Sequence, residues 1–314
     1  MHPEYQDSRI TRALQRYRAG LARAFTPGCN LERFHDTQQV LAMAERLSEP
    51  EIHTLGIATE YREGGLKAAR AGDLDEARAL VNRAREVYSK ATLSREAVEC
   101  AETYQSAAES YIRYKIGDFA AAERSMRESL ARCELLANEY GYPLETRRVH
   151  LARNIARVLA SAGDTEEALR ISVQLLEYIG GVEAAWPMPY QGPPRRVHLD
   201  DESVVFILDQ VVAEIVRLLQ PNDPAARTNL TAVARARDVL NAARVPAPVR
   251  RAAHCLTACA AWAIGDVDSF LDEAAAFFEG GRQSFDFTWR ELEHQFLDLA
   301  SLSRRVLGSC GELG

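Results

Sequence analysis

The sequence lacks the features of a membrane-spanning or secreted protein. No apolar run reaches the roughly 20 residues that a bilayer-spanning helix needs. The most hydrophobic stretch, residues 204–219, is interrupted by Asp209, Glu214 and Arg217. The first residues include no apolar core of signal-peptide length. We therefore expect no membrane association and a cytoplasmic location.

Cysteine is sparse, with six residues scattered along 314, and no CxxC pair occurs. Scattered thiols are typical of a reducing compartment. Cys255 and Cys259 are four residues apart and share a helix face, but no nearby Cys or His completes a four-ligand metal site. We expect two small core side chains there, and neither a bound metal nor another cofactor.

The chain also has fewer basic residues (38 Lys and Arg) than acidic residues (45 Asp and Glu). The net charge is −7 and the isoelectric point is about 5.6. Non-specific nucleic-acid binding needs a basic surface, so we expect no nucleic-acid partner.

Sequence motifs of common enzyme classes are missing, including GxGxxG, the Walker loop, HExxH and GxSxG. Two Glu-x-x-His pairs, Glu32/His35 and Glu291/His294, do occur. Such pairs serve in di-metal helical bundles, together with carboxylates from two further helices. A metal-dependent oxygenase is therefore a remote alternative, since the two pairs lie near opposite ends of the chain.

Helix-forming residues are abundant, and 47% of the chain is hydrophobic. A Gly-Asp step recurs at Gly72, Gly117, Gly163 and Gly265, each time between two stretches of helical periodicity. Glycine ends one helix and aspartate caps the next, which predicts antiparallel helix pairs. The first two intervals are 45 and 46 residues, and the longer third interval leaves room for a pair without Gly-Asp over residues 202–243.

The repeated unit resembles the tetratricopeptide repeat family. In the first unit, Gly65 is at the small-residue position, Gly72-Asp73-Leu74 forms the turn, and Ala77 and Ala84 are the packing alanines. The corresponding residues of the other units are Ser110, Gly117-Asp118-Phe119, Ala122, Ala156, Gly163-Asp164, Ala168, Ala258 and Gly265-Asp266. Ser129 and Phe270 replace alanines of the family pattern, Ser89 replaces the closing proline, and the period exceeds the family's roughly 34 residues.

The resemblance implies an all-α fold, a right-handed superhelix (α-solenoid) of about five antiparallel helix pairs with capping helices. We expect capping helices in residues 1–50, repeats 1–3 in 51–182, repeats 4–5 in 202–282, and a capping helix and tail in 283–314, as one continuous solenoid domain.

Residues 183–201 interrupt this pattern with four prolines between positions 187 and 194, which exclude a helix. The segment also contains Trp186, Met188 and Tyr190, which are unusual in a flexible linker. We expect an ordered loop over the groove, with a plain connector as the alternative.

In this family the first helix of each pair lines the concave face. Counting back from each Gly-Asp predicts a basic and aromatic groove on an acidic protein. With Trp186 of the loop, its predicted ligand-binding residues are Arg62, Arg70, Tyr104, Tyr111, Tyr114, Lys115, His150, Arg153 and Arg157. Arginine binds carboxylate or phosphate through parallel hydrogen bonds, and tyrosine adds contact area.

The groove predicts a binding protein for an anionic peptide, protein segment or small molecule. The alternative is an enzyme on the same scaffold, acting on a small carboxylate-bearing or carrier- or peptide-linked substrate in a biosynthetic pathway. The sequence leaves a homodimer open.

Overall fold

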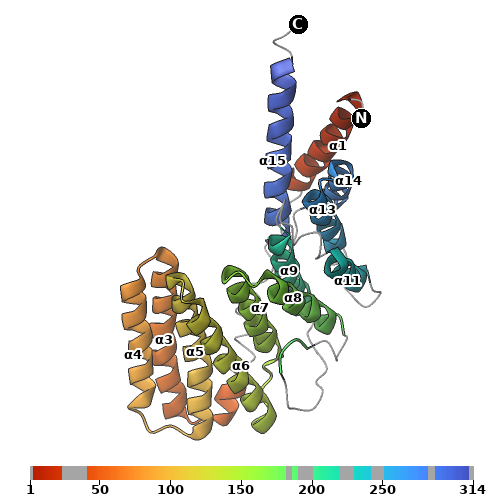
Figure 1. Cartoon of the computed structure of the whole chain (residues 1–314). Helices are drawn as coiled ribbons and strands as arrows, with labels where there is room; N and C mark the ends of the chain where they lie inside the picture. Colours follow the sequence, from red (N-terminus) through yellow and green to blue (C-terminus); the bar gives the residue numbers. More distant parts are fainter. Residues whose placement is uncertain are drawn as a thin grey trace. The chain divides into compact units, whose positions relative to one another are not determined.

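The computed structural model describes residues 3–22, 41–181, 186–189, 201–219, 230–241, 251–281 and 287–310 (Figure 1). Within these ranges the chain forms helices and no strand, which confirms the all-α class. The helices are α1 (Pro3–Ala22), α3 (Glu49–Ala71), α4 (Leu74–Ser89), α5 (Arg95–Ile116), α6 (Phe119–Glu139), α7 (Glu145–Ser161), α8 (Thr165–Ile179), α9 (Asp201–Leu218), α11 (Leu230–Asn241), α13 (Ala252–Ile264), α14 (Val267–Glu279) and α15 (Phe287–Cys310). None of the described helices has the length and hydropathy needed to cross a bilayer.

The chain divides into two compact units. The central unit contains residues 31–171 and 187–195. The terminal unit contains residues 1–30, 172–186 and 196–314, so both ends of the chain belong to it. The boundary falls within α8, where the sequence predicts one continuous solenoid domain.

The Gly-Asp turns have the predicted geometry. Gly72, Gly117, Gly163 and Gly265 all have φ between 80° and 93°, the left-handed conformation that glycine adopts without steric cost. The following aspartate caps the next helix; the side chain of Asp73, for example, accepts a hydrogen bond from the backbone N–H of Glu76 at 3.1 Å. Each turn therefore ends one helix and starts the next.

Helix pairs fill the central unit. α3 packs against α4, α5 against α6, and α5 also contacts α3 and α4 (Figure 1). Gly65 permits the close approach of α3 to α4, since a Cβ there would lie 2.7 Å from a methyl group of Val81. The small core between the pairs contains Ala69, Ala77, Val81, Ala108 and Ile112.

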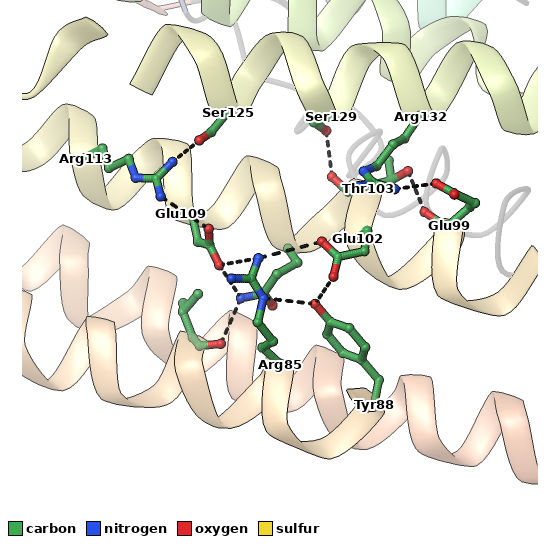
Figure 2. Close-up of polar contacts among 12 residues, drawn as sticks. Arg85, Tyr88, Glu99, Glu102, Thr103, Glu109, Arg113, Ser125, Ser129 and Arg132 are labelled. Atoms are coloured by element: carbon green, nitrogen blue, oxygen red, sulfur yellow. Dashed lines mark hydrogen bonds and ion pairs between the residues drawn. The ribbon is translucent and has the colours of Figure 1, made fainter. Parts of the chain in front are cut away.

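Polar contacts along one side of α5 join it to α4 and α6 (Figure 2). Arg85 of α4 pairs with Glu109 at 2.9 Å, and the hydroxyl of Tyr88 donates to Glu102 at 2.8 Å. On the α6 side, Ser129 donates to the carbonyl of Thr103 at 2.6 Å; Arg113 donates to Ser125, and Arg132 to Glu99. We call these contacts the interhelix network, and they fix the rotation of α5 relative to its neighbours.

The terminal unit is built around aromatic side chains. α1 packs against α14, and Tyr17 contacts Phe278, Trp289 and Phe296 with ring centroids 5.2–6.1 Å apart. Gly20 allows this packing, since a Cβ there would lie 2.6 Å from the carbonyl oxygen of Phe278. The sequence predicts α1 as a cap at the start of the repeats; the structure instead packs it against helices from the end of the chain.

The helices of the predicted fourth pair pack mainly on later helices. α9 contacts α13 and α15, and α11 contacts α13. Asp209 of α9 is buried and accepts hydrogen bonds from the backbone N–H groups of Phe287 and Thr288 at the start of α15. A side chain of α9 therefore supplies the cap of α15.

The proline-rich segment is described only at residues 186–189. Trp186 packs on Tyr178 with ring centroids 5.1 Å apart, within the terminal unit. Met188 is buried in the central unit and accepts a hydrogen bond on sulfur from Arg127 of α6 at 3.5 Å. α6 is the second helix of its pair. The sequence, in contrast, predicts that the loop covers the first helices of the pairs. Tyr190 and the remainder of residues 183–201 before α9 lie outside the described residues.

Candidate functional site: an arginine–tyrosine cluster

Three first helices of the central unit contribute one side chain each to a cationic cluster. The guanidinium carbon of Arg62, on α3, lies 5.6 Å from the ring centroid of Tyr104 on α5. The guanidinium carbon of Arg147, on α7, lies 4.6 Å from the same centroid. We call these residues the arginine–tyrosine cluster. Both guanidiniums are within the distance of a favourable cation–π interaction.

Helical geometry explains why Tyr104 is available for this cluster. At 3.6 residues per turn, Tyr104 and Arg113 lie about 180° apart around α5. Arg113, Glu102 and Glu109 belong to the interhelix network on the α4 and α6 side (Figure 2). Because that network fixes the rotation of α5, Tyr104 points toward the α3 and α7 side.

Arg62 is a buried cation with few polar partners. Its side chain is only 5% exposed, and its Nη2 donates to the Thr59 hydroxyl at 2.7 Å. Its Nη1 is buried and forms no hydrogen bond in the described structure. Burial lowers the pKa of Arg62 to about 10; the Tyr104 side chain partly opposes this shift, and the charge of Arg147 adds to it. Arg62 therefore remains protonated at neutral pH, at a cost in desolvation.

Arg147 resembles Arg62 in its lack of counter-charge. It is partly exposed, and its buried Nε has no hydrogen-bond partner in the described structure. No salt bridge joins Arg62 or Arg147 to a carboxylate of the described residues. Two nearby guanidiniums thus carry positive charge that the surrounding described residues do not neutralise.

Several other arginines of the central unit are neutralised by carboxylates. Arg148, the immediate neighbour of Arg147, is 1% exposed and pairs with Glu134 at 3.1 Å and with Glu145 at 2.8 Å. Arg85, Arg113 and Arg132 also have carboxylate partners. Arg62 thus differs from the similarly buried Arg148, which has two carboxylate partners.

A second cation–aromatic contact lies further along α5. The ammonium nitrogen of Lys115 lies 5.9 Å from the ring centroid of Tyr111, seven residues beyond Tyr104. The Tyr114 ring packs on Phe119, and its hydroxyl accepts from Ser161 of α7 at 3.1 Å. Side chains of α7 thus contact α5 both at Tyr104 and at Tyr114.

The other predicted site residues have different environments. Arg70 is exposed at the end of α3, and His150 and Arg157 are partly exposed on α7. Arg153, predicted to line the groove, is only 7% exposed and donates to Asn154 at 3.1 Å. Trp186 belongs to the terminal unit.

The prediction from the sequence missed Arg147. Arg62, Tyr104 and Arg147 precede their Gly-Asp glycines by 10, 13 and 16 residues. The contacting positions therefore shift by about one helical turn from each first helix to the next. A fixed count back from each glycine selects Arg153 in place of Arg147.

The predicted alternatives for metal binding gain no support from the described residues. No group of three or more potential ligands occurs among them. Glu291 accepts from Arg217 at 2.7 Å, and exposed His294 lies 3.6 Å from Asp298. Glu32 and His35 lie outside the described residues. Cys255 and Cys259 are fully buried, and burial raises the pKa of Cys255 well above that of an ordinary thiol.

Comparison with protein-family models, with curated proteins and with solved structures finds no match to this chain.

Proposed function

We propose that this protein binds an anionic partner on the face formed by α3, α5 and α7, with a peptide or protein segment as the foremost candidate. The arginine–tyrosine cluster is the anchoring subsite. Arg62 and Arg147 contact the acidic group, and Tyr104 supplies an aromatic surface beside it.

One observation carries the proposal: two guanidiniums lie against one ring without a carboxylate partner among the described residues. Burying a charge without a counter-ion is costly, so such groups are usually paired or hydrogen-bonded. A bound anion beside the partly exposed Arg147 would provide the counter-charge that the described residues do not supply. Tyr111 and Lys115 lie further along α5 than Tyr104 and would extend the contact surface.

The proposal includes a tetratricopeptide-like superhelix and a cytoplasmic location. The repeated Gly-Asp turns and the packing of α3, α4, α5 and α6 support the first part. The scattered cysteines support the second part, because thiols persist in a reducing compartment.

The test compares two pools of short fluorescent peptides by polarisation. One pool is rich in Asp and Glu, and the other has Asn and Gln at the same positions. We expect the wild-type protein to prefer the acidic pool, with affinity that falls as salt rises because exposed charges are screened. Arg147→Gln should weaken binding by roughly tenfold or more, since a hydrogen bond to a charged group contributes about 1.5–3 kcal/mol.

The matched control is Arg124→Gln, which removes the same charge from an exposed position on α6. It should leave binding unchanged. Equal binding of the two pools would overturn the proposal. A loss in Arg124→Gln without a loss in Arg147→Gln would move the binding surface to α6, where Arg124 lines an open depression of about 510 Å³.

A further inference from the structure

The number of unneutralised charges in the arginine–tyrosine cluster restricts the kind of anion that fits it; this inference rests on the proposed function. The two guanidiniums are close enough for the charge of Arg147 to disfavour protonation of Arg62. A single carboxylate carries one negative charge and would leave one positive charge unbalanced. A ligand group with two negative charges would balance both.

The orientation of the donors adds a second restriction. A guanidinium has five N–H donors in its plane, so an arginine that lies against a ring can still present the edge of that plane to an acceptor. Arg62 uses one such donor for Thr59, while its Nη1 is buried without a partner. Arg147 likewise has a buried Nε without a partner. The cluster therefore suits a compact group with several acceptor oxygens.

From these two restrictions we propose that the cluster binds a phosphomonoester group. Near neutral pH such a group carries about 1.5 to 2 negative charges and three strong acceptor oxygens. Arginine matches this geometry through two parallel hydrogen bonds, which a lysine ammonium cannot form. The Tyr104 ring provides an apolar surface for the carbon atoms next to the phosphate.

The phosphomonoester could belong to a phosphorylated protein segment or to a small phosphorylated metabolite, and both share this chemistry. Tyr111 and Lys115, further along α5, offer additional contacts to a longer ligand. A phosphoserine within a short uncharged peptide tests the first source when its affinity is compared with that of phosphoserine alone. A gain of at least about tenfold from the flanking residues would indicate a protein segment, and no gain would indicate a metabolite.

The main experiment is an NMR titration of the full-length protein with three probes of similar size: phenyl phosphate, phenyl sulfate and benzoate. At neutral pH, phenyl phosphate is mostly a dianion, whereas the other two are monoanions. Phenyl sulfate also has three terminal oxygens, so it isolates the effect of charge. We expect phenyl phosphate to bind at least about tenfold more tightly than either monoanion, because it neutralises both guanidiniums.

Two variants locate the effect. Arg147→Lys keeps the charge but loses the planar donor pair, and it should weaken phenyl phosphate binding by about tenfold. Arg124→Gln, at an exposed position of α6, should not change it. Equal affinity for the three probes would overturn the phosphomonoester inference and leave the proposed anion binding intact. If none of the probes and neither peptide pool binds, both proposals are wrong.

Discussion

Two buried arginines show how differently the same residue type is used in this protein. Arg148 is 1% exposed and is neutralised by Glu134 and Glu145. Arg62 is 5% exposed and contacts the Thr59 hydroxyl and the Tyr104 ring, with no carboxylate partner among the described residues. The first arrangement is that of a structural ion-pair network. The second is a buried positive charge that has no counter-charge among the described residues.

Replacing these arginines by methionine should separate the two roles. Arg62→Met removes an uncompensated buried charge and keeps much of the volume, so the free energy of unfolding should stay within about 1 kcal/mol of wild type or rise. Arg148→Met leaves two carboxylates without their partner and should lower it by about 3 kcal/mol. Urea unfolding measures both values. A loss in Arg62→Met as large as that in Arg148→Met would mean that Arg62 is structural.

The sequence predicted the residue types of the site better than their positions. Arg62 and Tyr104 were predicted on one face, and the structure brings them together. Arg153 was predicted beside them but is buried next to Asn154. The position of α7 depends on the turn at Gly141 (φ 74°) and on the packing of α7 against α6. Those tertiary contacts determine which α7 side chain reaches Tyr104, and local sequence does not encode them.

At the level of elements, the Gly-Asp turns were predictable because both residues have local roles. Gly72 needs positive φ, and a Cβ there would meet no atom within 4 Å, so backbone strain alone decides the effect of a substitution. Gly56 lies within α3, and a Cβ added there would also meet no atom within 4 Å. The two glycines differ only in the conformation that they adopt.

Alanine substitutions should therefore have opposite effects at these two glycines. Gly72→Ala should lower the free energy of unfolding by about 1 kcal/mol, since an L-residue in the left-handed region is strained. Gly56→Ala should raise it by about 0.5–1 kcal/mol, since alanine is the better helix former. Thermal or urea unfolding shows whether each substitution raises or lowers the free energy of unfolding. Stabilisation by Gly72→Ala would show that the turn is built differently.

Glu51 couples the starts of two first helices. Its carboxylate accepts from the backbone N–H of Ser48 at 2.9 Å and from that of Ser94 at 2.7 Å, next to the starts of α3 and α5. Hydrogen bonds from Ser94 and then Ser48 lower the pKa of Glu51 from its ordinary value of 4.5 to about 2. Because the folded-state pKa is lower, Glu51 stabilises the fold above about pH 4.5, and this stabilisation is lost as the pH falls toward 2.

Glu51→Gln should consequently be less stable than wild type at neutral pH, and the difference should shrink as the pH falls below about 4.5. Urea unfolding of both proteins across this range measures the difference. A constant difference at all pH values would show that the charge of Glu51 does not contribute.

At the level of the whole molecule, the sequence predicted the helical class but not the two units. Trp289, Leu292 and Phe296 of α15 are at helical spacing, which indicates a packed face but not the helix it packs against. The structure supplies Tyr17 of α1, whose hydroxyl donates to Glu293 at 2.7 Å and whose ring contacts Trp289. These residues are more than 270 positions apart in the chain. Local periodicity carries no information on contacts at that separation.

Tyr17→Ala should loosen the terminal unit. Loss of this partly buried ring from the aromatic cluster should lower local stability by about 2 kcal/mol. Hydrogen exchange should then accelerate in α1, α14 and α15, with α3, α4, α5 and α6 as an internal reference that stays unchanged. Uniform acceleration throughout the chain would contradict the division into two units.

The central claim, that the arginine–tyrosine cluster binds an anion, is tested most directly at the guanidinium groups. The Nε–H signals of Arg62, Arg147 and Arg124 can be assigned in NMR spectra by substituting each arginine in turn. On titration with phenyl phosphate, the signals of Arg62 and Arg147 should shift together along one saturable curve, while that of Arg124 stays in place. Unchanged Arg62 and Arg147 signals, or a shift of equal size at Arg124, would contradict the claim.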